Sequence, residues 1–364
     1  MVHILGHYKS FMRVNKIIMN NMMLKKITTL IVLISLSFLS YGQKTIVEKY
    51  GHLSVKGNYM VSEYGDTVQL RGMSLFWSQW MGQYYNSDVV KWLRDDWKCT
   101  VIRAAMGVDM GGYIENPDTE QGKVMEVVNA AISKGIYVII DYHSHEAQKN
   151  PKAAERFFST MAKKYGNIPN IIYEVYNEPL QTTSWNNEIK PYAEAVLKKI
   201  RTYDTTNIVV VGTRQWSQLV SEAALNRIND TLVMYTLHFY PGTHKQELRD
   251  EAQKALNMGI ALFVTEYGTC DASGNSNFSP EETALWYAFL DEHKISYCNW
   301  SIADKAETAS AIVPGANPYG GWAEYDLTPS GQLVRADMIL KNTPIFETLT
   351  KSNSEAEKKK KSKK

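Results

Sequence analysis

Residues 171–178 read IIYEVYNE, a run of large apolar residues that ends in an amide and a carboxylate, Asn177 and Glu178. Apolar and β-branched runs of this length are typical of strands that are buried on both faces, as in parallel sheets. A second run, LFVTEY at residues 262–267, contains Glu266 near its end. Because a charged group next to a buried strand is costly unless it is paired or functional, both strand ends are candidate parts of a site.

Including these two, the chain contains eight short apolar runs separated by amphipathic stretches of helical length. The expected strands are 68–74, 100–104, 137–143, 171–177, 208–213, 233–240, 262–267 and 297–301. The expected helices include 88–97, 125–134, 153–164, 192–202, 245–258 and 280–292. Eight alternating units predict an α/β fold that closes into a single (β/α)₈ TIM barrel.

Polar residues stand at or just beyond the ends of nearly all the expected strands. They are Arg103, Asp141, His143, Asn177, Glu178, His238, Tyr240, Glu266 and Trp300. The carboxyl ends of barrel strands meet on one face, where active sites of this fold are built. We therefore expect residues that lie some 200 positions apart to share one cleft.

The two glutamates suit retaining hydrolysis of a glycosidic bond, which needs two carboxyl groups about 5–5.5 Å apart. Arg103 and Tyr240 can hold Glu266 ionised as the nucleophile, while a partly apolar site can keep Glu178 protonated as the acid/base. Asn177, beside the acid, is placed to bond the sugar 2-hydroxyl. The alternative is a pair of ordinary salt-bridged carboxylates at the barrel rim.

Several short motifs in this order resemble glycoside hydrolase family five, in particular its bacterial cellulase branch. They are VIRAAM at 101–106, IDYH at 140–143, NEP at 177–179, HFY at 238–240, TEYG at 265–268 and WSIADKAE at 300–307. The resemblance covers roughly residues 46–345. Any one motif is weak evidence, but the ordered set is specific.

The resemblance implies endo cleavage of β-1,4-glucan, with Glu178 as acid/base and Glu266 as nucleophile. It implies supporting roles for Arg103, His143, Asn177, His238, Tyr240 and Trp300. It also marks Trp80, Lys305 and Glu307 as glucan contacts, with Trp300 as the platform at the cleaved sugar; His145 is a further candidate substrate contact. Phe76 and Gly107 depart from the pattern of the branch, which often has His and Tyr there.

Two other classes of function stay open. His143 and His145 form a His-x-His pair at a strand end, as in barrel metallohydrolases, and His238 and Asp304 are available as further metal ligands. This hypothesis leaves Glu178 and Glu266 unexplained, so we expect no metal and no cofactor. A glycan-binding protein that has lost catalysis is the other class, but such a protein is expected to lack one of the two glutamates.

Charge and composition indicate which classes of partner the protein can bind. The two ends of the chain carry a net charge of +10 out of a total of +2, so residues 43–350 carry about −8. An acidic globular part argues against a nucleic-acid partner. Nine Trp and 22 Tyr are more than a barrel core needs, which favours aromatic stacking on sugars. The three cysteines have no metal-ligand spacing.

The N-terminal sequence predicts export, and the C-terminal sequence predicts a disordered tail. Lys25 and Lys26 precede an apolar run at 27–39 and small residues at 40–42, the order of a secretory signal peptide with cleavage near Gly42. We expect an N-terminal extension and signal peptide over 1–42, a catalytic domain over 43–350 and a Lys-rich disordered tail over 351–364. We further expect a secreted or periplasmic monomer without a stable membrane anchor, acting on a β-glucan polysaccharide or oligosaccharide. The preferred glycan, whether glucan, mannan, xyloglucan or mixed-linkage glucan, is not fixed by these patterns.

Overall fold

The computed structural model describes residues 45–361, with side chains described as far as residue 350. These residues belong to one unit, Lys44–Lys364. The expected extension and signal peptide at 1–42 lie outside the described residues. The described part begins with a short helix and an antiparallel hairpin: α2 (Ile46–Tyr50), β1 (Ser54–Lys56) and β2 (Tyr59–Val61).

Eight parallel strands then close into a barrel in the order β10-β3-β4-β5-β6-β7-β8-β9. The strands are β3 (Arg71–Leu75), β4 (Val101–Gly107), β5 (Tyr137–His143), β6 (Ile171–Glu174), β7 (Val209–Val211), β8 (Val233–Phe239), β9 (Leu262–Tyr267) and β10 (Ser296–Ile302). The predicted (β/α)₈ TIM barrel is therefore confirmed.

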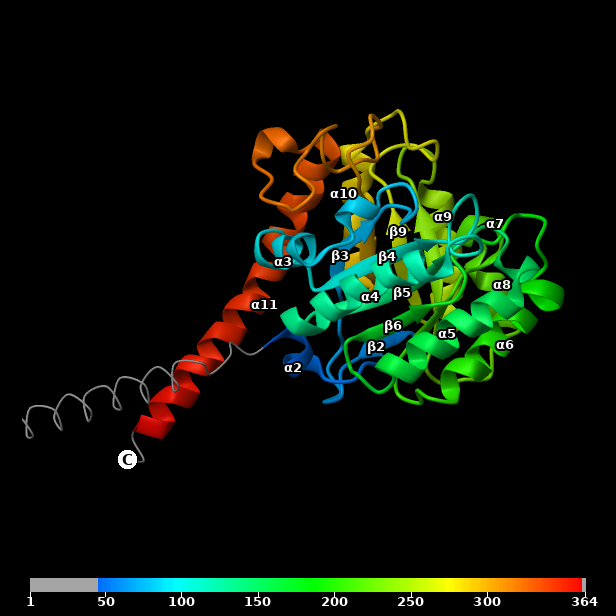
Figure 1. Ribbon diagram of the computed structural model, residues 1–364, viewed down its shortest axis with the longest axis horizontal. Coiled ribbons are helices and arrows are strands. Elements are labelled where there is room, and N and C mark those ends of the chain that lie inside the picture. The colour runs from blue at the N-terminus through cyan, green and yellow to red at the C-terminus, as the bar shows by residue number, and fades with distance from the viewer. Residues whose placement is uncertain (1–44, 362–364) are drawn as a thin grey trace, which may run out of the picture. The chain divides into compact units, whose positions relative to one another are not determined.

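Helices alternate with the strands and cover the outside of the barrel (Figure 1). The α-helices are α3 (Ser87–Asp95), α4 (Pro117–Lys134), α5 (Pro151–Tyr165), α6 (Lys190–Arg201), α7 (Arg214–Ser217), α8 (Val220–Leu225), α9 (Gln246–Asn257), α10 (Pro280–Glu292) and α11 (Pro329–Lys361). Short 3₁₀ or π segments are η1 (Gly82–Tyr84), η2 (Ala147–Lys149), η3 (Trp185–Ile189) and η4 (Glu324–Asp326).

The helices pack as their amphipathic patterns predict. In α5, Ala154, Phe157, Phe158 and Met161 recur at helical spacing and all are buried. The expected helix at 125–134 is the second half of α4, which begins eight residues earlier because Pro117 stands in its first turn, where proline is favoured.

Two expected strands are shorter in the structure. β6 ends at Glu174 rather than residue 177, and β7 spans three residues rather than 208–213. The polar residues Asn177 and Glu178 therefore lie in the loop after β6, where their side chains are free to enter the site.

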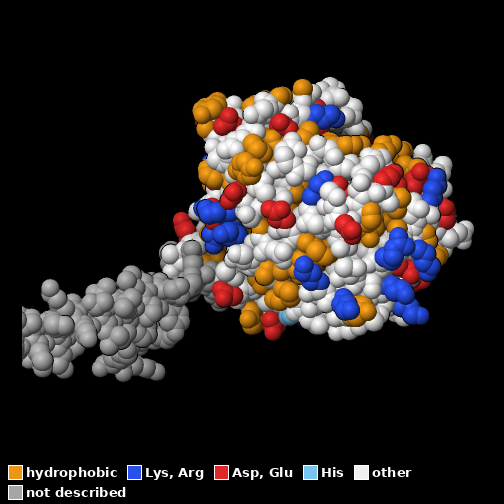
Figure 2. Space-filling model, viewed as in Figure 1, with side chains coloured by type: hydrophobic (Ala, Val, Ile, Leu, Met, Phe, Trp, Pro, Cys, Tyr) orange, Lys and Arg blue, Asp and Glu red, His pale blue; other side chains and the backbone are white. Residues whose placement is uncertain are grey.

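Helix α11 extends to Lys361, into the segment expected to be a disordered Lys-rich tail. The side chains from residue 351 onward lie outside the described part, so the tail stays a prediction. Among the described residues, no helix has both the length and the apolar composition needed to cross a membrane. Figure 2 shows Lys and Arg side chains interspersed with Asp and Glu over one face of the described residues.

The barrel interior changes character along its axis. Val101, Ile139 and Ile172 are fully buried, and two residues further along each of these strands Arg103, Asp141 and Glu174 are fully buried on the same inner face. The ladder between β8 and β9 shifts register between Thr236 and His238. Irregularities of this kind re-aim side chains next to active sites.

Candidate active site

A cleft of about 640 Å³ opens at the carboxyl ends of the strands. Its lining includes every predicted site residue except Arg103 and Asn177: Trp80, His143, His145, Glu178, His238, Tyr240, Glu266, Trp300, Lys305 and Glu307. Arg103 and Asn177 are buried and contact this set from inside the barrel. The structure thus brings all the predicted residues together.

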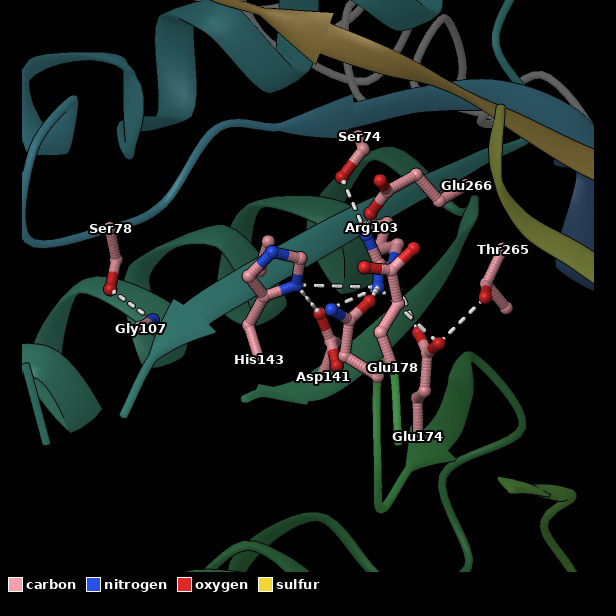
Figure 3. A network of polar contacts seen from close by, with 12 residues as sticks. Ser74, Ser78, Arg103, Gly107, Asp141, His143, Glu174, Glu178, Thr265 and Glu266 are labelled. Carbon is pink, nitrogen blue, oxygen red and sulfur yellow. Dashed lines mark hydrogen bonds and ion pairs between the residues drawn. The ribbon is translucent and has the colours of Figure 1, made fainter. Parts of the chain in front are cut away.

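Arg103, on β4, organises the floor of the cleft (Figure 3). Its Nε donates to Glu174 Oε2 at 2.8 Å, and its Nη1 lies 3.0 Å from Glu266 Oε2. Its Nη2 lies 2.9 Å from Asp141 Oδ2 and 2.6 Å from Asn177 Oδ1. A guanidinium presents its N–H donors in a fixed planar fork, so this single side chain sets the positions of four others.

Glu266 receives a hydrogen bond on each carboxyl oxygen. Arg103 donates to Oε2, and the Tyr240 hydroxyl donates to Oε1 at 2.8 Å. Both contacts were expected from the sequence, and the structure has them. Hydrogen bonds from a cation and a hydroxyl stabilise the ionised form of a carboxyl group.

Glu178 has a different environment. Its Oε1 lies 2.9 Å from Nδ1 of His238, and its Oε2 lies 3.5 Å from Nδ1 of His145. Burial raises the pKa of Glu178 to about 7, although His145 and Arg103 oppose this shift. One oxygen of Glu178 and one of Glu266 lie within 4.8 Å of each other. The two carboxyl groups are therefore close together but differ in their donors.

Two further acids lie under the cleft. Burial raises the pKa of Asp141 to about 8 and that of Glu174 to about 7, with Arg103 opposing both shifts. One guanidinium is thus shared by more carboxyl groups than it can neutralise. Glu174 was not predicted as a site residue, although the signal was present: it is a carboxylate within the apolar run 171–178.

The two histidines under and beside the cleft are neutral. Burial and the positive charge of Arg103 hold the pKa of His143 well below its usual value, and burial lowers that of His238 to about 4. Nδ1 of His143 lies 2.7 Å from Asp141 Oδ2 and 3.4 Å from Nη2 of Arg103. The His143 ring stacks on Trp300 with centroids 5.0 Å apart.

An aromatic wall bounds one side of the cleft. Phe76 packs against Trp300 with ring centroids 5.1 Å apart and lies 6.4 Å from Trp80, which is 50% exposed. Lys305 Nζ bonds Glu307 at 2.6 Å and lies 5.7 Å from the Phe76 ring. Phe76, one of the two departures from the family pattern, therefore extends the apolar wall.

The second departure, Gly107, is explained by a neighbouring side chain. A Cβ added at Gly107 would lie 1.6 Å from Oε1 of Gln79, so Gln79 occupies the space that a larger residue would fill. Gln79 Nε2 donates to the carbonyl of Asp109 at 3.1 Å. The sequence alone does not reveal this replacement, because residues 79 and 107 meet only in the folded barrel.

Trp216 lines the cleft beyond Glu178 and is 40% exposed. It lies in a run of three residues with left-handed backbone, Gln215, Trp216 and Ser217, with φ of 59°, 53° and 58°. Such conformations are unfavourable for residues other than glycine. The turn is held by the Ser217 hydroxyl, which donates to the carbonyl of Asn177 at 2.7 Å.

No clear metal centre is built from the predicted histidine pair. Among the described residues, the donor atoms close enough to share an ion belong to Glu178, His238 and Glu266, not to His143 and His145. Those atoms already have protein partners: His238 Nδ1 contacts Glu178, and Glu266 contacts Arg103 and Tyr240. The geometry favours the two-carboxylate interpretation over the metal one.

Comparison with known proteins identifies the family of the chain. Residues 61–306 match the family described as Cellulase (glycosyl hydrolase family 5). Endoglucanase A of Evansella cellulosilytica is 47% identical over 322 residues, which are 86% of this chain and 66% of that protein. The chain thus spans about two thirds of the length of this relative.

Solved structures give the same result. A structure from Cytophaga hutchinsonii is 85% identical, has a TM-score of 0.84, and the match covers 84% of this chain and 100% of that one. A Thermobifida fusca endoglucanase Cel5A catalytic domain in complex with cellotetraose is 32% identical, with a TM-score of 0.78 and coverage of 81% and 99%. The chain belongs to glycosyl hydrolase family 5.

Proposed function

We propose that this protein is an endo-β-1,4-glucanase that hydrolyses its substrate with retention of anomeric configuration. The observation that carries this proposal is the Glu178–Glu266 pair, whose oxygens approach within 4.8 Å in an open cleft. Retaining pairs are about 5–5.5 Å apart, whereas inverting pairs are about 6.5–9.5 Å apart to admit a water.

The environments divide the two roles. Glu266, with donors on both oxygens, is the nucleophile that attacks the anomeric carbon. Glu178, whose pKa is raised to about 7, holds a proton near neutral pH and gives it to the leaving oxygen. In the second step Glu178 takes a proton from water, and the water attacks the anomeric carbon and releases Glu266.

Neighbouring side chains support these steps. Arg103 holds Oδ1 of Asn177 and leaves the buried Nδ2 without a protein partner, so this amide can bond the sugar 2-hydroxyl. His143 supports the Trp300 ring from one side by stacking. These contacts orient the sugar at the point of cleavage.

The substrate follows from the cleft walls and the relatives. Trp80 and Trp300 offer aromatic faces for sugar rings, and Lys305 and Glu307 offer polar contacts on the same side. His145 lines the cleft beside Glu178. The relatives named endoglucanase, and one complex with cellotetraose, favour β-1,4-glucan chains.

Export and oligomeric state complete the proposal. An N-terminal extension and signal peptide over 1–42 would direct export to the periplasm or the medium, and the catalytic domain over 43–350 would act there as a monomer. Mass spectrometry of the exported protein gives the cleavage site, and light scattering gives the oligomeric state.

The deciding experiment is stereochemical. Proton NMR of a cello-oligosaccharide digest should show β-configured reducing ends first, before mutarotation. A fall in viscosity of soluble β-glucan that runs ahead of reducing-end release should show endo cleavage. Initial α-product contradicts the double displacement, and activity on mannan but not on glucan contradicts the substrate.

A further inference from the structure

Behind Glu178 lies a chain of hydrogen bonds that runs into the barrel. Nδ1 of His238 contacts Glu178, and Nε2 of the same ring lies 2.9 Å from Oγ1 of Thr265. The Thr265 hydroxyl donates to Glu174 Oε1 at 2.6 Å, a contact drawn in Figure 3. Two glutamates are therefore joined through one imidazole and one hydroxyl.

The number of protons fixes the direction of this chain. A hydroxyl has one hydrogen to donate and two lone pairs that accept. Thr265 contacts three partners, Glu174, His238 and the hydroxyl of Thr236. If its hydrogen goes to Glu174, the other two partners must donate, so His238 carries its hydrogen on Nε2. Nδ1 then presents a lone pair to Glu178.

We propose that Glu174 is a positioning residue for Glu178: through Thr265 and His238, its carboxylate directs an imidazole lone pair at Glu178 and so keeps the catalytic proton there. This inference rests on the proposed role of Glu178 as acid/base.

The reverse direction is disfavoured by Arg103. Reversal of all three bonds would move the proton from Glu178 to Glu174 and turn an Nδ1–H toward Glu178. Arg103, however, donates Nε to Glu174 Oε2 at 2.8 Å and Nη2 to Oε1 at 3.3 Å. Two N–H groups of a guanidinium stabilise the ionised form of a carboxyl group, so when the two glutamates share one proton, Glu174 carries the charge and Glu178 the proton.

The charged and titratable groups around both glutamates are known. Glu178 faces His145, His238, Tyr240 and Glu266, with Arg103 nearby, and Glu174 faces Arg103, Asp141 and His238. Of these, His238 contacts Glu178 at 2.9 Å and lies 4.0 Å from Glu174. Arg103 acts on both glutamates through its charge, whereas His238 joins them through hydrogen bonds, directly to Glu178 and through Thr265 to Glu174.

The test uses Thr265→Val, which removes the hydroxyl and keeps the β-branched shape. Without an acceptor for Nε2–H, the Nδ1–H form of His238 becomes favourable and stabilises ionised Glu178. We expect the alkaline limb of kcat/KM on a cello-oligosaccharide to move down by about half to one pH unit, with about tenfold lower activity above pH 7. Glu174→Gln should move it in the same direction, because a negative charge near Glu178 is lost as well.

Two matched variants test the specificity of this effect. Thr265→Ser keeps the hydroxyl and should retain the alkaline limb. Thr236→Val removes the neighbouring hydroxyl that is not in the chain, and should also retain it. On a dinitrophenyl cellobioside, whose leaving group needs no proton, Thr265→Val should stay within about threefold of the wild type.

A second measurement needs no core variant. ¹⁵N NMR of histidine-labelled wild-type protein near pH 6 should show His238 as the Nε2–H form, with the signal assigned by its loss in His238→Asn. An Nδ1–H form, or a Thr265→Val profile equal to that of Thr236→Val, overturns the role of Glu174. If Glu178→Ala lacks any dependence on the leaving group, the proposed acid is wrong instead, so the two failures are distinguishable.

Discussion

Two arginines on neighbouring strands bind carboxylates in different ways. Arg71 is the first residue of β3, at the amino end of the barrel, whereas Arg103 on β4 is level with Ser74, toward the carboxyl end. Arg71 bonds Asp291 of α10 and Asn342 of α11 on the outside of the barrel, whereas Arg103 bonds carboxyl groups inside it. The comparison separates a cluster that stabilises the fold from one that is suited to chemistry.

At the amino end, cations and carboxylates are balanced. Arg71 bonds Asp291 at 3.0 Å, and Lys341 bonds both Asp291 and Asp337 at 2.7 Å. Burial opposes ionisation of Asp291, but hydrogen bonds from Lys341 and Arg71 hold its pKa below the usual value. Asp291 is therefore ionised and paired at neutral pH, and its ion pairs stabilise the fold.

At the carboxyl end, Arg103 alone faces Asp141, Glu174 and Glu266, with Glu178 close by. Burial raises the pKa of Asp141, Glu174 and Glu178, and neighbouring carboxyl groups add to this shift. Perturbed groups of this kind gather at functional sites. The two ends therefore differ in burial and in charge balance: cations and carboxylates are matched at the amino end, whereas fully buried carboxyl groups share one arginine at the carboxyl end.

The largest expected effect is on turnover. Glu266→Ala and Glu178→Ala should each lower kcat on a cello-oligosaccharide by roughly four orders of magnitude with little loss of thermal stability. Asp291→Ala, at the other end, should lower the melting temperature and leave kcat within about threefold. Calorimetry and steady-state kinetics measure both. Normal turnover in either glutamate variant would show that the site is elsewhere.

Exchange of each arginine for lysine tests whether Arg103 acts on activity and Arg71 on stability. Arg103→Lys loses the planar fork that holds four side chains, so we expect kcat/KM to fall by about 100-fold or more. Arg71→Lys should lower the free energy of unfolding by about 1 kcal/mol and change kcat/KM by less than about threefold. Equal effects of the two substitutions on kcat/KM would contradict the division of roles.

The pH dependence of activity should be set by Glu178, at the carboxyl end of the barrel, and not by Asp291 at the amino end. Glu178 must be protonated to act as an acid, and burial raises its pKa to about 7. We therefore expect kcat/KM to fall about tenfold per unit as pH rises above 7. The Asp291→Asn control should have the same alkaline limb. If the alkaline limb of kcat/KM moved in Asp291→Asn, the two ends of the barrel would be coupled.

The pH dependence of stability should have opposite signs at the two ends. Glu in an unfolded chain titrates at about pH 4.3, whereas the pKa of Glu178 in the folded protein is raised to about 7. Between these pH values the folded protein binds more protons at Glu178 than the unfolded chain does, so the contribution of Glu178 to the free energy of unfolding falls as the pH rises. Glu178→Gln should therefore raise the free energy of unfolding by about 1–3 kcal/mol at pH 7.5 and change it little at pH 4.

Asp291 provides the contrast, because its pKa is lower in the folded protein than in the unfolded chain. Its carboxylate therefore stabilises the fold at pH values above the pKa of the unfolded chain, and this contribution is lost as the pH falls through the pKa of the folded protein. Asp291→Asn should destabilise at pH 7.5, and the difference should vanish in acid. Urea unfolding at several pH values measures both variants. The same sign for both would refute the comparison.

The smallest expected effect is that of chelation. If the carboxyl groups around Arg103 act by proton transfer and nucleophilic attack, activity should be unchanged after prolonged EDTA treatment. Loss of activity that zinc or nickel restores would instead support the metal hypothesis for His143 and His145.

Much of the fold was readable because strand and helix periodicities are local. The eight runs and the polar residues at their ends predicted a barrel, and that arrangement placed Glu178 and Glu266 in one cleft. The extra length of α4 and the early ends of β6 and β7 were missed, since capping and strand pairing depend on neighbours that the local pattern does not specify.

The alternation of strands and helices could be read from the sequence, as could the two glutamates that line one cleft, because apolar periodicity and the polar residue at each strand end are properties of short segments. Only the tertiary structure decided which groups share Arg103, that Gln79 fills the space beside Gly107, and that Glu174 reaches Glu178 through Thr265 and His238. These relations join residues from different strands. Their energies depend on distances and burial that exist only once the barrel has closed.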